Sequence, residues 1–290
     1  MAQRTVARAA GPRQIVGNLL DSVPAVHPIE RLRYVARASG APQAVLVRET
    51  AAALGSLAFD PAGLVTACRR VLDGHPACGS LWWLAARVLT TVGDPDEEGW
   101  RCAEELEDDP TAAELAHALP HDASVVVLGW PELTGDALSR RGDVDVLAVD
   151  ALDEGSGLVR QLRAYGVAAT DVPVSGLGAA VRRSDLLVLE ASAAGPDSVV
   201  AVAGSLAAAA VAQQSGVPVW AVVGRGRRLP GRMLDALLDR VALEHGDEPW
   251  RASDEAVPAS LLDTVVGPAG HAEGNRLPRR GHNRHAAGRR

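Results

Sequence analysis

The sequence contains no lysine and few aromatic residues, and both absences narrow what the protein can do. Lysine and arginine together number 29, and all of them are arginine. Without lysine there is no Schiff-base amine and no lysine to hold a nucleotide phosphate. An anion site would have to use arginine, backbone N–H groups or a helix N-terminus. Aromatic residues are only 3% of the chain, so alanine, valine and leucine must fill its core.

Cysteine is also scarce, and the chain has three: Cys68, Cys78 and Cys102. They are too few and too irregularly spaced for a disulfide framework or a zinc site, which favours small buried residues in a reducing compartment. A metal site on His117 and His121 is disfavoured because Pro120 breaks the helix between them. The sequence therefore predicts no metal and no cofactor.

No segment has the pattern of a targeting or membrane-spanning sequence. The N-terminus lacks the apolar core of a signal peptide. The longest apolar run, Val199 to Ala212, is interrupted by Gly204 and Ser205, and it is too short and too rich in alanine to cross a bilayer. These features predict a cytoplasmic protein with no membrane partner.

The formal net charge of −7 is unevenly distributed. In Gly267–Arg290 arginine outweighs the single acidic residue, Glu273, so the rest of the chain is more acidic than the whole. An acidic body argues against a general nucleic-acid-binding surface on the fold. The stretch 267–290 is interpreted as a disordered basic tail, which supports RNA or ribosome binding weakly and fits a solubilising role equally well.

Residues 1–120 are predicted to form a helical domain. Pro42–Leu57 is rich in alanine, and Asp96–Asp108 is acidic and amphipathic. Asp60-Pro61 places an N-cap before a proline at the first helical position, which predicts a helix through Leu72. A set of carboxylates at the end of the Asp96–Asp108 helix is interpreted as a solvated face rather than a metal or acid–base site, because no histidine accompanies them: Glu104, Glu105, Glu107, Asp108 and Asp109.

After Pro120 the pattern changes to short apolar strands that alternate with helices of about ten residues. The strands are predicted at Ser124–Trp130, Val144–Asp150, Val167–Val172, Asp185–Ala191 and Val217–Gly224. Continuous apolar strands of this kind form a parallel sheet that is covered on both faces. The sequence thus predicts an α/β fold, with a helical N-terminal domain followed over 121–266 by a Rossmann-like parallel sheet domain with helices on both faces.

Open parallel sheets bind ligands at the carboxyl ends of their strands. Gly129 follows the first strand, and Asp150–Gly157 follows the second. Gly204 and Ser205 begin an alanine-rich helix, whose free N–H groups and dipole favour a phosphate. Gly204 would equally serve close packing of that helix on the sheet.

The glycine-rich loop after the fifth strand supplies three further candidates for ligand binding: Arg225, Arg227 and Arg228. Their guanidinium groups suit an oxyanion clamp, and a solvated basic loop is the competing interpretation. The loop is not a dinucleotide fingerprint, because it lacks the third glycine and follows the last strand rather than the first.

Three segments share a pattern with one protein family. In Asp197–Gly224 a glycine turn leads to Gly-Ser, an alanine-rich helix, Gly-Val-Pro and a strand. Asp185–Ser192 resembles the preceding strand, and Glu154–Val167 resembles a glycine-led helix. Over Val125–Val241 the chain therefore resembles the C-terminal domain of the initiation factor 2B alpha, beta and delta subunits, ribose-1,5-bisphosphate isomerase and methylthioribose-1-phosphate isomerase. The helical first part also suits this family.

The resemblance stops at the catalytic positions of the isomerases. They use a cysteine in the loop after the first strand, where this chain has Gly129–Gly135. They use an aspartate where this chain has Ser192, and Asn-Lys where it has Ala201-Val202. Isomerisation needs an acid or base and polar groups that steady the developing charge. The chain is therefore interpreted as a divergent, non-catalytic and regulatory member.

The resemblance implies a homodimer and, as in regulatory members of the family, a phosphorylated sugar or nucleotide as ligand. Two alternatives stay open: a sugar-phosphate isomerase with a relocated active site, and an RNA- or ribosome-associated scaffold. For the isomerase, Glu190 is the best replacement acid because it stands at a strand end two residues before the lost aspartate. Asp197 and Asp150 are the next candidates.

Overall fold

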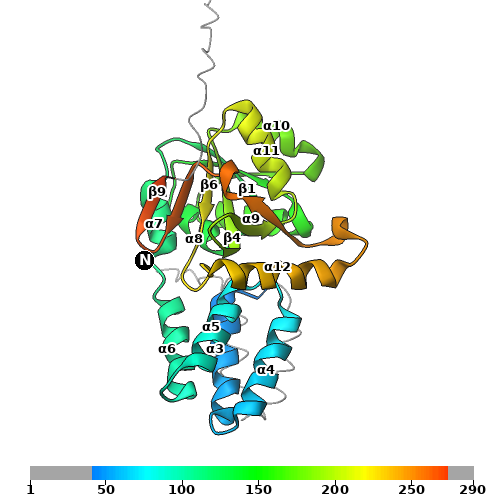
Figure 1. Ribbon diagram of the computed structural model, residues 1–290. Helices are drawn as coiled ribbons and strands as arrows, with labels where there is room; N and C mark the ends of the chain where they lie inside the picture. Colours follow the sequence, from blue (N-terminus) through cyan, green and yellow to red (C-terminus); the bar gives the residue numbers. More distant parts are fainter. Residues whose placement is uncertain (1–40, 274–290) are drawn as a thin grey trace, which may run out of the picture.

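The computed structural model describes residues 41–273 (Figure 1). The described part begins with five α-helices: α3 (Gln43–Leu54), α4 (Pro61–Gly74), α5 (Gly79–Thr90), α6 (Pro95–Glu107) and α7 (Thr111–Ala118). A 3-10 turn, η1 (Gly55–Leu57), extends α3. The part of the predicted helical domain that precedes residue 41 lies outside the described residues.

Two of these helices begin at an aspartate followed by proline. The Asp60 carboxylate accepts the N–H of Gly63 at 3.0 Å, and Pro61 occupies the first turn of α4. Asp94 does the same for α6 by accepting the N–H of Asp96 at 2.9 Å. Both caps satisfy backbone donors that the helix leaves free, as predicted for Asp60-Pro61.

Nine strands follow: β1 (Ser124–Leu128), β2 (Asp145–Val149), β3 (Ala168–Val172), β4 (Leu186–Ala194), β5 (Ser198–Val202), β6 (Val219–Val222), β7 (Asp254–Pro258), β8 (Thr264–Gly267) and β9 (Gly270–Glu273). The sheet order is β3-β2-β1-β4-β6-β8-β9, parallel through β8 and antiparallel at β9. Strand β5 lies antiparallel to the far part of β4, and β7 pairs antiparallel with β5.

Five further helices connect the strands: α8 (Glu132–Leu138), α9 (Gly155–Ala164), α10 (Leu177–Arg183), α11 (Ser205–Ser215) and α12 (Gly231–His245). Short 3-10 turns occur at η2 (Ala151–Asp153), η3 (Val174–Gly176), η4 (Pro249–Arg251) and η5 (Ala259–Leu261). The alternation of strand and helix is the one predicted from the sequence.

Alternate residues of the central strands face two different cores. In β1, Val126 and Leu128 pack with α10 and α11, whereas Val125 and Val127 pack with α7, α8 and α9. This explains why the central strands are apolar throughout, since both of their faces are buried. The fold class is confirmed: an α/β protein with a Rossmann-like parallel sheet, helices on both faces and preceding helices.

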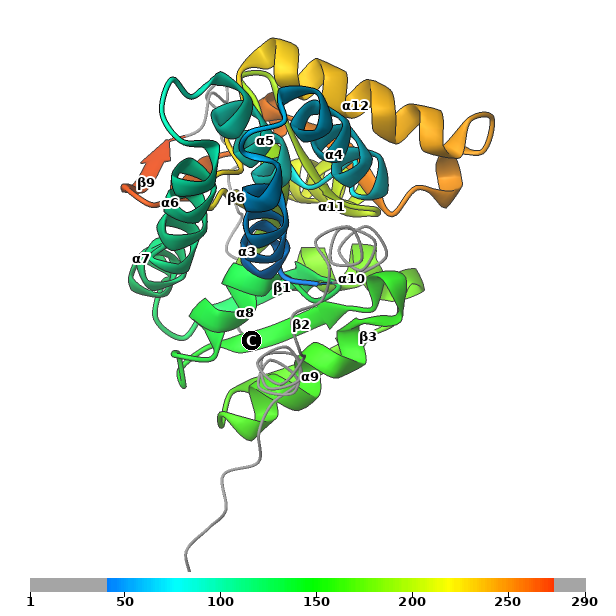
Figure 2. The same cartoon turned by 90° about the horizontal axis from the view of Figure 1, so that it is seen from below.

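Helices α3–α6 form a separate layer beneath the sheet, and α12 lies between the two parts (Figures 1 and 2). The α12 side chains Leu234 and Leu237 are buried against Ala193 and Val200 of β4 and β5, while Trp82 and Trp83 of α5 pack against the same cluster. This cluster joins the helical layer to the sheet through apolar contact.

Two boundaries differ from those predicted. Helix α7 was assigned to the helical domain over 1–120, but Leu115 and the following Leu119 are buried in the core that the sheet shares with α8 and α9. Strand β9 extends the sheet to Glu273, inside the stretch 267–290 that was predicted to be a disordered tail. Hydrogen bonds to β8 place this segment in the sheet, and residues 274–290 lie outside the described part.

Candidate functional site

A cavity of about 90 Å³ lies at the carboxyl ends of the central strands. It is bounded by the ends of β1, β4 and β5, the start of α11 and the loops that follow β1 and β2. Its lining residues are Leu128, Trp130, Pro131, Glu154, Val188, Leu189, Glu190, Val202 and Ser205. The cavity is therefore at the edge where the sequence predicted a ligand.

Ser205 brings an unused hydroxyl group to this cavity. Gly204 adopts a φ of +95°, a left-handed conformation that favours glycine, and turns the chain from β5 into α11. Ser205 is fully buried, and its Oγ has no hydrogen-bond partner within residues 41–273. A buried hydroxyl without a partner costs free energy, so this group is suited to a bound molecule.

The N-terminus of α11 already holds a carboxylate. The N–H of Leu206 donates to Glu255 Oε1 at 2.8 Å. A carboxylate satisfies the free donors and the dipole of a helix N-terminus in the same way that a phosphate would. Gly204 and Ser205 therefore begin the helix as predicted, but one of the N–H groups proposed for phosphate is occupied.

Glu154 stands between β2 and α9 and is a half-buried acid that lines the cavity. Its carboxylate lies beside the Gly129 turn, where a Cβ atom would be 3.4 Å from Glu154 Oε2. Partial burial raises the pKa of Glu154, and the nearby Asp254 adds to this effect. Gly129 itself has a φ of +62° and donates to Val149 O at 2.9 Å.

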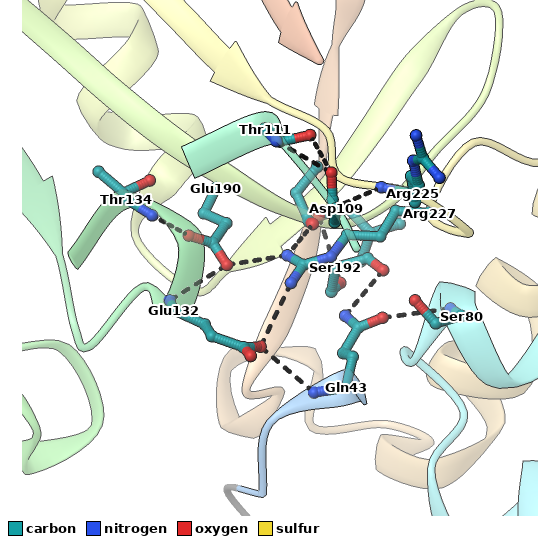
Figure 3. Close-up of polar contacts among 12 residues, drawn as sticks. Gln43, Ser80, Asp109, Thr111, Glu132, Thr134, Glu190, Ser192, Arg225 and Arg227 are labelled. Carbon is teal, nitrogen blue, oxygen red and sulfur yellow. Dashed lines mark hydrogen bonds and ion pairs between the residues drawn. The ribbon is translucent and has the colours of Figure 1, made fainter. Parts of the chain in front are cut away.

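Glu190 is bound by donors on three sides (Figure 3). Its carboxylate accepts the N–H of Glu132 at 3.1 Å, the N–H of Thr134 at 2.8 Å and Arg227 Nη1 at 2.8 Å. Only 8% of the Glu190 side chain is exposed, and only 6% of the Arg227 side chain. Charge-assisted hydrogen bonds of this kind hold Glu190 in place as an acceptor.

Arg227 joins a second carboxylate and a carbonyl group in the same network. Its Nη2 lies 3.4 Å from Glu132 Oε2, and its Nη1 donates to Ala191 O at 2.9 Å. Figure 3 shows Arg227 between the two glutamates, with the Arg225 side chain pointing away from them. Arg227 is therefore not free to clamp an anion, and Arg228 is exposed on the neighbouring surface.

Gln43 of α3 ties this network to the helical layer. Its backbone N–H donates to Glu132 Oε2 at 3.3 Å, and its Nε2 donates to Ser192 O at 3.0 Å. Its Oε1 accepts the N–H of Ser80, at the start of α5, at 3.1 Å. One residue thus connects α3, α5, the end of β4 and the start of α8 through its backbone N–H and its side chain (Figure 3).

Asp109 fixes the arginine-containing loop from the other side. Its Oδ2 accepts the N–H of Arg225 at 2.8 Å, and its Oδ1 accepts the N–H and the hydroxyl of Thr111 at 3.0 and 2.6 Å. The sequence placed Asp109 among solvated carboxylates. In the structure this residue holds a loop of the sheet domain against the start of α7.

Of the remaining predicted acids, Asp150 caps the helix that follows it. Its Oδ1 accepts the N–H of Gly155 at 2.7 Å. Asp197 lies in the turn between β4 and β5, where its carbonyl accepts the N–H of Ala259 at 2.8 Å. Neither residue lines the cavity. Glu154 does, and its position directly before Gly155-Ser156-Gly157 at a strand-to-helix turn was the signal in the sequence.

The three cysteines lie away from the cavity, in the helical layer. Burial raises the pKa of Cys68 to about 11 and those of Cys78 and Cys102 to about 12. Thiols of this kind are poor nucleophiles at neutral pH. Within residues 41–273 no three His, Cys, Asp or Glu side chains are arranged to hold a metal ion. Every helix in that range is too short or too polar to span a bilayer.

The architecture of this chain is similar to that of several solved structures. No protein-family profile and no curated protein sequence matches the chain. The crystal structure of the Pyrococcus horikoshii OT3 translation initiation factor eIF-2B matches with a TM-score of 0.71 at 14% identity, over 87% of this chain and 98% of that one. The fold is thus of the class that joins a helical layer to a Rossmann-like sheet.

Two structures from Chaetomium thermophilum also match the chain. Chaetomium thermophilum eIF2B beta matches with a TM-score of 0.66 at 14% identity, over 91% of this chain and 93% of that one. A chain of the tetrameric eIF2B-beta2-delta2 complex from C. thermophilum matches with a TM-score of 0.65 at 16% identity, over 91% and 96%. This chain has the fold of the initiation factor 2B subunits.

Proposed function

We propose that this chain is an initiation factor 2B-like regulatory protein without isomerase activity, which works as a homodimer and binds a small metabolite in the cavity at the strand ends. The observation that carries the proposal is the unpartnered, fully buried hydroxyl of Ser205 in that cavity. The likeness of the fold to initiation factor 2B subunits supports it.

The state of Glu190 supports the absence of catalysis. A general acid or base must be able to exchange a proton with the reacting group. Glu190 instead accepts two backbone N–H groups and the Arg227 guanidinium, and these donors hold both of its oxygen atoms. Glu190, the predicted replacement acid, therefore has a structural role in this network.

One observation favours the isomerase alternative, and it concerns Glu154 rather than Glu190. Glu154 lines the cavity, and burial raises its pKa, a direction that suits a carboxyl group acting as a general acid or base. If catalysis occurs, Glu154 is the acid or base that the geometry favours. The RNA- or ribosome-associated alternative rests on the basic segment after residue 273, outside the described residues, and no observation within 41–273 favours it.

We expect purified protein not to interconvert ribose-1,5-bisphosphate or methylthioribose-1-phosphate with its ketose isomer. The measurement is a coupled assay at high enzyme concentration, followed by a thermal-shift screen of metabolites that begins with phosphorylated sugars and nucleotides. Turnover of about 1 per second, as in working enzymes, that disappears in Glu154→Gln but persists in Glu97→Gln would establish the isomerase instead. Glu97 is an exposed residue of α6.

We also expect the protein to be a homodimer in solution. Two-fold dimers are the commonest oligomers, and one of the matching structures belongs to a tetrameric complex. Static light scattering at micromolar concentration should give twice the chain mass of 30.1 kDa. A mass equal to a single chain across a tenfold dilution series would contradict the dimeric part of the proposal.

A further inference from the structure

The charge around the cavity is set by carboxylates rather than arginines. Glu154 lines it and forms no ion pair with an arginine or histidine of residues 41–273. Glu190 also lines it, and the Arg227 guanidinium beside Glu190 is shared with Glu132. Arg227 therefore contacts both of these carboxylates, whereas no arginine or histidine of the described range pairs with Glu154.

Two more acidic side chains lie close to this group. Asp254 is near enough to Glu154 to raise its pKa, and burial raises the pKa of Asp254 as well. Glu255 follows in the chain and occupies the N-terminus of α11, next to Ser205. A phosphate dianion placed in the cavity would be repelled by Glu154, whereas a cation would relieve the cost of burying that carboxylate.

Trp130 provides an apolar and polarisable wall beside Glu154. Trp130 and Glu154 both line the cavity, and the Trp130 backbone N–H lowers the pKa of Glu154, against the larger effect of burial. The indole ring lies tightly against α9, because a Cβ atom on Gly157 would be 2.4 Å from Trp130 Cζ3. Indole rings attract organic cations, and a carboxylate next to one adds a direct ionic contact.

The same features exclude a metal ion as the occupant. Within the described residues no His, Cys, Asp and Glu side chains form a group of three suited to a metal. The side chains of Leu128, Val188 and Leu189 also bring none of the oxygen ligands that Mg²⁺ or Ca²⁺ requires. The positive charge must then belong to an organic group that also presents an apolar surface.

We infer that the cavity selects a small hydroxylated amine, with its ammonium group on Glu154 beside Trp130 and its hydroxyl group on Ser205 Oγ. The inference rests on the proposed function, in that the cavity is taken as the ligand site. It replaces the phosphorylated ligand expected from the sequence, because Arg227 is paired with glutamates and the start of α11 holds Glu255.

Three two-carbon probes test which charge the cavity binds, because each carries a hydroxyl group and they differ in charge: ethanolamine is a cation, ethylene glycol is neutral and glycolate is an anion. Each is titrated into the full-length protein carrying ¹⁵N-labelled tryptophan, and the indole N–H signal of Trp130 is assigned with Trp130→Phe. Ethanolamine should shift this signal saturably, with a millimolar Kd, as expected for four heavy atoms. Ethylene glycol should bind at least tenfold more weakly, and glycolate should give no saturable shift.

The variants test which residues are responsible. Glu154→Gln should weaken ethanolamine binding at least tenfold and abolish its advantage over ethylene glycol, and Ser205→Ala should weaken both probes. Glu97→Gln should bind as wild type does. The Glu154→Gln protein should fold, because it removes a carboxylate whose burial is unfavourable, and Glu154→Asp provides a second variant that keeps the charge.

Equal or tighter binding of glycolate or inorganic phosphate would overturn the inference, as would an absence of ethanolamine binding or wild-type binding in Glu154→Gln. These results would reject the amine ligand but would not by themselves reject the proposed regulatory function. A phosphorylated metabolite that binds in the thermal-shift screen, and whose binding is lost in Ser205→Ala, would support a regulatory ligand site in the cavity while rejecting the amine. Isomerase turnover would instead reject the proposed function.

Discussion

Replacing Arg227 with methionine is expected to lower the free energy of unfolding by about 3–5 kcal/mol. The substitution keeps a long apolar side chain but removes the guanidinium that pairs with Glu190 and Glu132. Glu190 is only 8% exposed, so its carboxylate would remain buried with two backbone N–H partners and no cation. Urea denaturation followed by tryptophan fluorescence measures the loss.

A matched control lies one residue further along the loop. Arg228 is exposed, and Arg228→Met should change the free energy of unfolding by no more than about 0.5 kcal/mol. Combining Arg227→Met with Glu190→Gln should recover part of the loss, because the uncompensated charge is removed as well. If Arg227→Met and Arg228→Met unfold alike, the network does not stabilise the fold.

The network also explains how the sheet and the helical layer are held in one arrangement. Gln43 reaches Ser192 O and the N–H of Ser80, while its own N–H donates to Glu132. Glu132 in turn shares Arg227 with Glu190. The residues that looked like a catalytic acid and an anion clamp therefore connect the two parts of the molecule, which leaves ligand binding to the cavity beside them.

The central strands could be predicted from sequence because each is apolar on both faces. β1 and β4 are flanked by turn residues, and their hydrophobic runs alternate with helical segments, which favours buried strands. β5 was missed because only Ala203 and Gly204 separate Ser198–Val202 from the alanine-rich helix α11, so that strand and helix form one nearly continuous apolar run. No periodicity separates strand from helix in so short an apolar run.

The sequence could predict where the site lies, but not which side chains contact one another there. Parallel topology places Gly129, Glu190 and Ser205 at one edge, which local pattern alone can predict. Which carboxylate meets Arg227 depends on contacts over long separations, such as the 37 residues between Glu190 and Arg227. Glu255 reaches the start of α11 from β7, a strand with only one buried residue and no distinct pattern.

The position of α5 against β4 leaves no room for a side chain at Gly79. A Cβ atom there would lie 2.7 Å from Ser192 O and 2.9 Å from Ala193 Cβ. The Ser192 carbonyl is also the acceptor of Gln43 Nε2, so a shift of the strand would disturb the contact between the layers. Gly79→Ala is therefore expected to cost about 1–3 kcal/mol of unfolding free energy, as overpacked contacts do.

Gly178, near the start of α10, is the matched control because no atom lies within 4 Å of the Cβ that alanine would add. Gly178→Ala should leave stability unchanged or raise it by about 0.4–1 kcal/mol, since alanine restricts the unfolded chain. Urea denaturation gives both values, and hydrogen exchange of the peptide 186–194 reports on β4 directly. Faster exchange there in Gly79→Ala alone is the expected result. Stabilisation of both variants would show that α5 moves away from β4 at no cost, and that the contact between the layers is looser than its geometry indicates.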